Sequence, residues 1–320
     1  MAAPSYTKLP PGLSSSPPSV PNIIISFPSP HVLQVTLNRP RQLNAIPRPM
    51  HFALGRLWDW YDEEATLRCA VFTGSGRAFC AGQDLKEWDK INHDDVDVDT
   101  STSTSGKETF TDDRAVTETS GGSSSSSKRF PSSGFGGISN RQGKKPIIAA
   151  VNGICFGGGM EMAINCDMVI ASPKATFSLP EVTIGVIALA GALPRLQRSV
   201  GRQRAAEMAL GGKVYTAGEM KDWGLVNEVV GDGDGDGDGD DDVVVGAAIK
   251  WAERIAGNSP DSVIVSREGL MLGWEGVGPC QGTDLVIKGL YGRIEKGDNM
   301  LEGVRSFVER RKPVWKDSKL

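Results

Sequence analysis

The order strand, glycine loop, helix occurs twice in this chain, and this repetition constrains the fold more than any other feature. Cys69 to Thr73 form a short apolar run that ends in Gly74, and Ile147 to Val151 form another that ends in Asn152 and Gly153. Short apolar runs bounded by glycine are typical of strands buried on both faces. Parallel strands joined by helical crossovers bind ligands at the carboxyl ends of the strands. We therefore predict an α/β fold with a site at the glycine loops.

The segments around the two repeats carry weaker patterns. Ile23 to Phe27 and Val32 to Leu37 predict an opening hairpin, and Pro49 to Glu64 carries apolar residues at helical spacing. After residue 242 the sequence predicts four helices, at Val243 to Ala256, Pro260 to Trp274, Thr283 to Glu295 and Asn299 to Arg311. An α/β core followed by a helical trimerisation layer fits this order.

Three segments are too polar, or too rich in proline and glycine, to build a core. Residues 1–21 lack the cationic start and apolar stretch of a secretory signal and are predicted to form a disordered arm. Residues 89–133 are predicted to be a low-complexity surface insertion, and residues 231–242 a Gly/Asp linker. A calcium loop beginning at Asp232 would need Glu at its twelfth position, where this chain has Val243, so a flexible acidic linker is favoured over a calcium site. This division leaves a core at 22–230 and a C-terminal helical region at 243–320.

Composition excludes several classes of function. The 320 residues carry a net charge of −4, which disfavours a general nucleic-acid binder. Five cysteines form no CxxC pair, and none of the three histidines lies near a nucleophile motif. Disulfides, metal centres and catalytic triads are therefore disfavoured, and we predict no metal. No apolar run is long enough to predict a membrane span.

The glycine triplet from Gly157 to Gly159 is the strongest chemical signal. The apolar run Met160 to Ile164 follows it and predicts a helix, whose first N–H groups lack partners and favour negative charge. Such groups can stabilise an oxyanion. Close helix packing is the alternative explanation of three consecutive glycines.

Two carboxylates, Glu161 and Glu181, accompany the triplet. A lone glutamate near a helix start usually caps the helix or lies on the surface. Two glutamates beside an oxyanion site can instead transfer protons. The other glycine-rich segments match no dinucleotide, phosphate-loop or nucleophile-elbow motif.

Several motifs in order give the chain a specific family resemblance between Ile23 and Arg311. They are Leu37 to Pro40 with Asn44 and Ala45, Ala78 to Lys86, Ala149 to Glu161, Cys166 and Asp167, Phe177 to Glu181, Gly185, and Trp223 to Asn227. With these motifs the chain resembles the enoyl-CoA hydratase/isomerase (crotonase) superfamily, and most of all its fungal peroxisomal members. Some of those members serve siderophore or toxin pathways.

The resemblance implies a crotonase-like (ClpP/crotonase) spiral of ββα units, with the C-terminal helices forming a homotrimer or a hexamer. It also implies an acyl-CoA substrate whose thioester oxygen lies between the backbone N–H groups of Gln83 and Gly158. Further CoA contacts are implied for Ala81, Asp84, Leu85 and Lys86 as well as for those two residues. Coenzyme A is then part of the substrate, and no separate cofactor is expected.

By the same resemblance, Glu161 deprotonates the attacking water and Glu181 serves the proton delivered to Cα. Both carboxylates together favour a hydratase, which adds water to a 2-enoyl-CoA or removes it. One alternative is a Δ3-Δ2 enoyl-CoA isomerase that uses Glu181 alone. The other is a non-catalytic CoA-binding or RNA-binding scaffold on the same fold, which the carboxylate pair and the negative charge disfavour.

Two departures from the family pattern concern the substrate. Residues 185–194 lack the usual glycine-rich stretch that ends in a Gly-Gly pair, so the acyl pocket is expected to differ from that of fatty-acid enzymes. The insertion after Trp88 follows the first oxyanion loop directly and is expected to affect the entrance.

The final residues are Ser318, Lys319 and Leu320. A terminal Ser-Lys-Leu is the address read by the peroxisomal import receptor, so a peroxisomal location is expected. The alternative is a chance polar tail.

Overall fold

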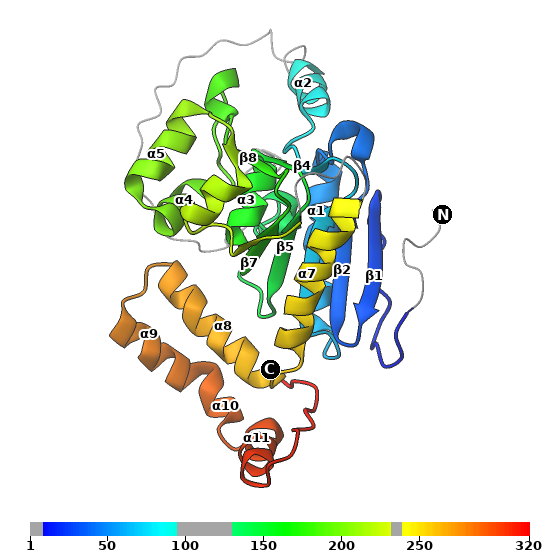
Figure 1. Ribbon diagram of the computed structural model, residues 1–320, viewed down its shortest axis with the longest axis vertical. Coiled ribbons are helices and arrows are strands. Elements are labelled where there is room, and N and C mark those ends of the chain that lie inside the picture. Colours follow the sequence, from blue (N-terminus) through cyan, green and yellow to red (C-terminus); the bar gives the residue numbers. More distant parts are fainter. Residues whose placement is uncertain (1–8, 95–129, 232–238) are drawn as a thin grey trace, which may run out of the picture.

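The computed structural model describes residues 9–94, 130–231 and 239–320. Residues 95–129, which make up most of the predicted insertion, lie outside the described residues, as do residues 1–8 and most of the Gly/Asp segment (232–238). Two sheets and a series of helices make up the fold (Figure 1).

The first sheet has six strands in the order β1-β2-β3-β5-β7-β10. Their bounds are β1 Ile23–Ser29, β2 Val32–Leu37, β3 Cys69–Gly74, β5 Ile147–Val151, β7 Met168–Ala171 and β10 Glu228–Val229. Strand β1 pairs antiparallel with β2, and every other neighbouring pair is parallel. The opening hairpin and both parallel strands predicted from the sequence are confirmed.

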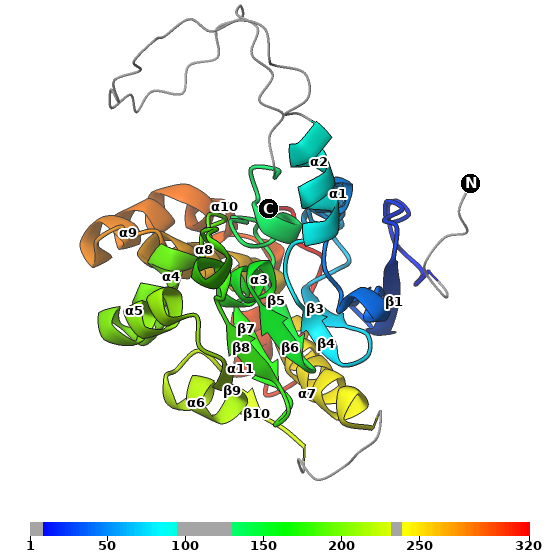
Figure 2. The same cartoon turned by 90° about the horizontal axis from the view of Figure 1, so that it is seen from above.

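The second sheet has four short strands in the order β4-β6-β8-β9 (Figure 2). Their bounds are β4 Ala78–Cys80, β6 Ile154–Phe156, β8 Thr176–Ser178 and β9 Tyr215–Thr216. The glycine loops predicted after Thr73 and after Val151 each contain a short strand, β4 and β6, that the sequence did not indicate. Strands of three residues are too short to produce a periodic pattern, so only tertiary pairing reveals them.

The helices are α1 Arg48–Glu63, α2 Leu85–Asp94, α3 Gly158–Asn165, α4 Ala192–Val200, α5 Arg202–Gly211, α6 Ala217–Asp222, α7 Gly239–Ala256, α8 Pro260–Trp274, α9 Pro279–Val286, α10 Gly292–Ile294 and α11 Asp298–Val308. The 3-10 turns are η1 Pro40–Gln42, η3 Phe135–Gly137 and η4 Glu181–Ile184, and η5 Ile287–Tyr291 is a π-helical turn. None of the helices in the described part of the chain is both long and apolar enough to cross a membrane.

A repeated unit underlies this order. A strand of the first sheet is followed by a strand of the second and then by a helix, in β3-β4-α2 and again in β5-β6-α3. The predicted spiral of ββα units is confirmed. Because successive units stack in parallel, the segments after β4 and after β6 lie beside each other.

Helices cover both faces of the first sheet. Val32, Val71 and Ile148 pack with Val244 and Ala248 of α7, whereas the alternate strand residues face the larger core around α1 and α3. Burial on both faces explains why these strands read as continuous apolar runs. In α7 the small residues at spacing four let the helix lie close to the sheet.

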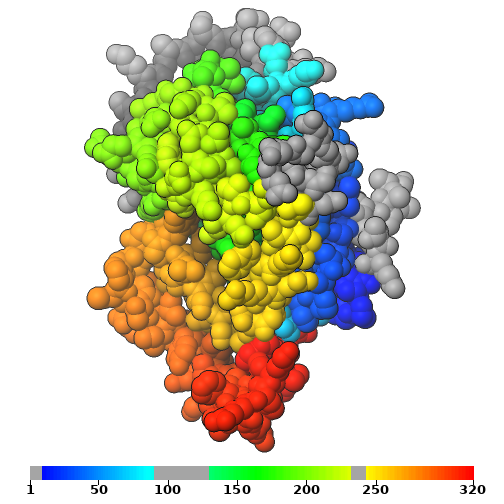
Figure 3. All heavy atoms as spheres, in the orientation of Figure 1, coloured from blue at the N-terminus to red at the C-terminus, as the bar shows by residue number. Residues whose placement is uncertain are grey.

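Two predicted boundaries differ from the bounds of the helices. Helix α7 begins inside the predicted linker (231–242) and packs on the first sheet. Helix α2 likewise continues to Asp94, beyond the predicted start of the insertion. Helices α8 to α11 lie at one end of the molecule (Figures 1 and 3).

Residues 9–21 contact the core, which corrects the prediction of a disordered arm for this part of residues 1–21. Val20 is buried, and the backbone N–H of Ser14 donates to Glu64 Oε2 at 2.8 Å. Trp60 Nε1 donates to Ser15 Oγ at 2.9 Å. The segment is thus anchored by hydrogen bonds to Trp60 of α1 and to Glu64 at the end of that helix. A proline- and serine-rich composition does not indicate such contacts.

Candidate active site

The second glycine loop connects β6 to α3. Gly157 has φ +53°, a conformation that favours glycine, and its N–H donates to Ser178 O at 3.0 Å. Helix α3 begins at Gly158, and Glu161 N donates to Gly157 O at 3.0 Å. The N–H of Gly158 therefore belongs to the first turn, where N–H groups have no partner within the helix and can bind an anion.

The first glycine loop carries Gln83 between β4 and α2. Ile46 N donates to Gly82 O at 2.9 Å, and Asp84 N donates to Ile46 O at 3.2 Å. Ile46 and Gln83 thus form a parallel bridge, in which both hydrogen bonds of Ile46 go to the neighbours of Gln83 and not to Gln83 itself. The backbone N–H of Gln83 therefore points away from Ile46.

The two loops touch each other. Gly82 has φ +98°, and a Cβ atom built on it would lie 3.2 Å from both Gly158 N and Phe156 O. A Cβ atom on Gly158 would overlap the Phe135 ring, and one on Gly159 would overlap Cys80 O. Close packing therefore accounts for these glycines, and the same packing brings the Gly158 N–H beside the first loop. Close packing is thus confirmed as one explanation of the triplet, and the oxyanion site at Gly158 stays a prediction.

Glu161 lies in the first turn of α3 and is buried. Its Oε1 accepts hydrogen bonds from Ala190 N at 2.8 Å and Ala192 N at 3.3 Å. Burial raises the pKa of Glu161 to about 7, and the charge of Glu181 acts in the same direction, against the two backbone bonds. A carboxyl group with a pKa near neutral can both accept and release a proton.

Glu181 begins η4 and lies across Gly157 from α3. A Cβ atom on Gly157 would lie 3.2 Å from Glu181 Oε1, so the Glu181 carboxylate lies close to the start of α3. Burial raises the pKa of Glu181. Its Oε2 atom is buried and accepts no hydrogen bond from the described residues, which leaves a lone pair for a water molecule or a substrate.

The motif Leu37 to Ala45 holds the first loop in place. Arg39 N donates to Asn44 Oδ1 at 2.8 Å, and Asn44 Nδ2 donates to Ala78 O at 2.6 Å. Ala81 N donates to the backbone oxygen of Leu43 at 2.9 Å.

The predicted CoA contacts fall into two groups. The carboxylate of Asp84 pairs with Arg39 at 3.0 Å and accepts from Glu87 N at the start of α2, so it supports the loop. Leu85 and Lys86 are exposed at the same helix start and can contact a ligand.

One residue of this region gave no functional signal in the sequence. His51 of α1 is fully buried, and its Nε2 lies 3.2 Å from Gln83 Oε1. His51 precedes Leu54 by three residues and Trp58 by seven, so all three lie on the same buried face of the helix. This spacing could have indicated an inward-facing imidazole.

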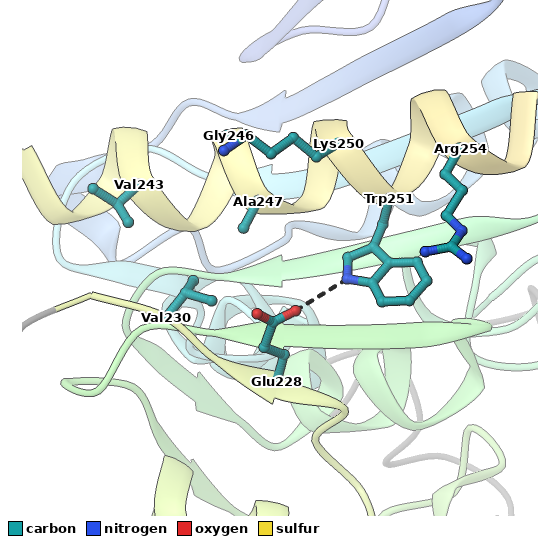
Figure 4. A pocket seen from close by; sticks show the side chains of 8 residues that line it. All are labelled: Glu228, Val230, Val243, Gly246, Ala247, Lys250, Trp251 and Arg254. Atoms are coloured by element: carbon teal, nitrogen blue, oxygen red, sulfur yellow. Dashed lines mark hydrogen bonds between the residues drawn. The ribbon is translucent and has the colours of Figure 1, made fainter. Parts of the chain in front are cut away.

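A separate groove of about 600 Å³ lies between α7 and β10. Glu228 and Trp251 face each other across it, joined by a hydrogen bond of 3.0 Å (Figure 4). The remaining lining residues are Val230, Val243, Gly246, Ala247, Lys250 and Arg254. None of the residues that the sequence predicted for catalysis or CoA binding lines this groove.

The terminal tripeptide lies against the helical end of the molecule. Ser318 Oγ donates to Asp261 Oδ1 at 2.5 Å, and Lys144 Nζ donates to Leu320 O. Arg293 Nη2 donates to Lys319 O at 3.3 Å.

The comparison with known proteins gives a consistent result. Residues 134–318 and 32–119 match family models that are both described as enoyl-CoA hydratase/isomerase. The mevalonyl-coenzyme A hydratase of Beauveria bassiana is 53% identical over 96% of this chain and 99% of that protein. The enzyme of the same name from Aspergillus fumigatus is 43% identical over 95% of this chain and 98% of that protein.

A solved structure agrees with these relatives. The enoyl-CoA hydratase of Bacillus anthracis superimposes with a TM-score of 0.72 at 30% identity, covering 93% of this chain and 100% of that chain. The order of ββα units and the identity over nearly the whole length lead to one conclusion. The chain belongs to the enoyl-CoA hydratase/isomerase (crotonase) family.

Proposed function

We propose that this enoyl-CoA hydratase interconverts a 2-enoyl-CoA and its 3-hydroxyacyl-CoA through Glu161 and Glu181. The observation that carries the proposal is the carboxylate pair beside Gly157, formed by buried Glu161, whose pKa is raised to about 7, and half-buried Glu181. The lone pair of Glu181 Oε2 and the two backbone N–H groups support the same assignment.

In the hydration direction, Glu161 takes a proton from water while the water oxygen bonds to Cβ of the enoyl chain. Glu181 gives a proton to Cα, so that the elements of one water molecule are added across the double bond. Negative charge that develops on the thioester oxygen is stabilised by the N–H groups of Gln83 and Gly158. Exchange with solvent returns a proton to Glu181 and removes one from Glu161.

For the acyl chain, we propose the dihydroxylated, methyl-branched chain of mevalonyl-CoA. The two fungal relatives that match this chain over almost their whole length carry that substrate in their names. The departure of residues 185–194 from the family pattern fits a chain other than a plain fatty acid, because this segment follows Glu181 and supplies Ala190 and Ala192 to Glu161.

The test compares hydration of crotonyl-CoA with hydration of the dehydrated form of mevalonyl-CoA, followed by loss of absorbance of the conjugated thioester. We expect kcat/KM to favour the hydroxylated chain by about tenfold or more, because a site built for a hydroxyl discriminates against its absence. Glu161→Gln and Glu181→Gln should each lower kcat by about 100-fold or more.

The same variants distinguish the alternatives. Isomerisation of a 3-enoyl-CoA that survives in Glu161→Gln, with no hydration by the wild type, would establish the isomerase. Acyl-CoA binding without turnover of either kind would establish the scaffold.

We propose a peroxisomal location, supported by Ser318, Lys319 and Leu320. The test expresses the full chain with an N-terminal fluorescent tag in a filamentous fungus. Deletion of residues 318–320 should move the fluorescence from peroxisomes to the cytosol. Unchanged import of the deletion variant contradicts this proposal and leaves the catalytic one intact.

We also propose that the protein assembles as a trimer or a hexamer through its C-terminal helices. Support comes from α11, where Leu301, Val304 and Val308 fall on one face at spacing three and four and are 62%, 64% and 74% exposed. Contiguous exposed apolar surface of this kind marks protein interfaces.

A further inference from the structure

The hydrogen bonds of His51 determine which of its ring nitrogens carries the proton. Gly136 N donates to His51 Nδ1 at 3.0 Å, so Nδ1 is an acceptor and carries no hydrogen. The hydrogen is then on Nε2, which donates to Gln83 Oε1 at 3.2 Å. His51 is a neutral imidazole with both nitrogens engaged inside the protein, so neither is left to contact a substrate.

The surroundings of His51 are apolar. The imidazole packs against the rings of Phe130 and Phe135, with centroids 5.0 and 4.4 Å away, and its side chain is fully buried. Burial lowers the pKa of His51 to about 4, in agreement with the neutral form. Burying a polar ring costs folding free energy that an apolar side chain would avoid. The two hydrogen bonds of His51 offset this cost.

Those two bonds lead to both halves of the predicted oxyanion hole. The bond from His51 Nε2 holds the side chain of Gln83, whose backbone N–H is one predicted donor. The bond that His51 Nδ1 accepts holds Gly136 in η3. The neighbouring residue Phe135 has its ring against Gly158, which is the other predicted donor. Trp58 Nε1 fixes the same turn by donating to Gly136 O at 3.1 Å.

We infer that His51 is a positioning residue for the oxyanion hole, holding Gln83 directly and Gly158 through the turn at Phe135 and Gly136. The inference rests on the proposed function, because it assumes that these two N–H groups receive the thioester oxygen. It also gives the Gln83 side chain a task that the backbone role alone does not require.

The test uses the full-length protein with His51→Leu, Gln83→Leu and the double variant. His51→Leu should lower kcat for hydration by about 10- to 100-fold with KM changed by less than about twofold, because misplaced donors weaken binding of the transition state more than of the substrate. Gln83→Leu should lower kcat in the same direction but by less, because the bond from Gly136 to His51 remains. The double variant should lose little more than His51→Leu alone, because that variant already interrupts the contact with Gln83.

Two variants separate positioning from general loss of stability. His51→Gln keeps an N–H donor for Gln83 Oε1 and should recover most of kcat. Trp60→Phe removes a hydrogen bond from the opposite end of the same helix, to Ser15, and should leave kcat unchanged.

A spectroscopic readout addresses the hole itself. Butyryl-CoA with a 13C-labelled thioester carbonyl should show a lower carbonyl stretching frequency when bound to the wild type than in water. In His51→Leu the frequency should move back toward the value in water. A wild-type frequency and wild-type kcat in this variant would overturn the inference, as would additive losses in the double variant.

Failure of the proposed function gives a different result. In that case the wild type hydrates neither enoyl-CoA, whereas the carbonyl frequency still reports whether His51 aligns the two donors. If His51→Leu does not fold, Gln83→Leu and His51→Gln provide the same comparison.

Discussion

Glu161 and Glu181 have raised pKa values because of their surroundings in the folded chain. Both are carried on turns that the glycine triplet allows to approach closely, and burial raises the pKa of each. For Glu161 two backbone N–H groups stabilise the charged form and only partly offset burial. In the proposed mechanism, burial costs folding free energy and supplies carboxyl groups that hold a proton more readily than exposed glutamates do.

The raised pKa of Glu161 predicts a pH-dependent cost to stability. The pKa of about 7 in the folded state exceeds the ordinary glutamate value of 4.5, so the folded state holds an extra proton between these two pH values. The stability this proton contributes is present at low pH and is lost as pH rises toward 7. Glu161→Gln escapes this loss, and near pH 8 it should exceed the wild type in stability by up to about 3 kcal/mol more than near pH 4.5.

Thermal unfolding of both proteins across this pH range measures the difference. Glu219 provides a control of opposite sign, because hydrogen bonds to Thr216 lower its pKa at the exposed start of α6. Glu219→Gln should lose stability relative to the wild type as pH rises through the titration of this group. A stability gap for Glu161→Gln that is independent of pH would contradict the raised pKa.

At the scale of elements, the short strands β4 and β6 determine the site. They pair in parallel and bring the segment after each, with Gln83 and Gly158, to one edge of the second sheet. The loops then meet at Gly82, where a side chain would press on the backbone of Phe156 and Gly158. The distance between the predicted donors, the N–H groups of Gln83 and Gly158, therefore depends on Gly82, which is not itself a donor.

Gly82→Ala should accordingly lower kcat by about 100-fold, because its methyl group separates the two loops. It should also cost about 1 kcal/mol or more of stability, because φ +98° disfavours residues other than glycine. Steady-state kinetics and thermal unfolding measure the two effects.

Gly224→Ala is the matched control for this variant. Gly224 has φ +86°, and nothing lies within 4 Å of a Cβ atom built there. The control should lose similar stability and keep full activity. Equal activity of both variants would show that contact between the loops does not set the rate.

At the scale of the whole molecule, the C-terminal helices lie at one end (Figure 3), and α11 carries exposed apolar side chains. Phe307 is 84% exposed, next to the apolar face of α11. The proposed assembly predicts that light scattering after size exclusion gives the mass of a trimer or hexamer. The double variant Val304→Asp, Phe307→Asp should give a monomer, because two charges at the interface would be desolvated without partners.

Ile24→Asp on β1 serves as a control for this assembly. Ile24 is 39% exposed and lies at the edge of the first sheet, away from α11. This variant should keep the wild-type mass. A monomeric wild type would contradict the proposed assembly and leave the assignment of Glu161 and Glu181 unaffected.

Local sequence was sufficient for the longer elements. The apolar runs of β3 and β5 and the helical spacing of α1 and α8 agree with the structure to within one residue, because burial on a face or a stripe leaves a periodic pattern. The family motifs identified the enoyl-CoA hydratase/isomerase family, and the comparisons confirm it. The glycine triplet and both glutamates were also visible in the sequence.

Tertiary structure decided the features that depend on distant contacts. The strands β4 and β6 are too short to carry a pattern, and α7 joins the core because its small side chains meet a sheet formed far earlier in the chain. His51 gains its contact with Gln83 only when α1 packs against the first loop. The sequence thus determined which groups are available for the proposed catalysis. Folding determined their pKa values and their alignment, because burial and hydrogen bonding depend on segments that are remote along the chain.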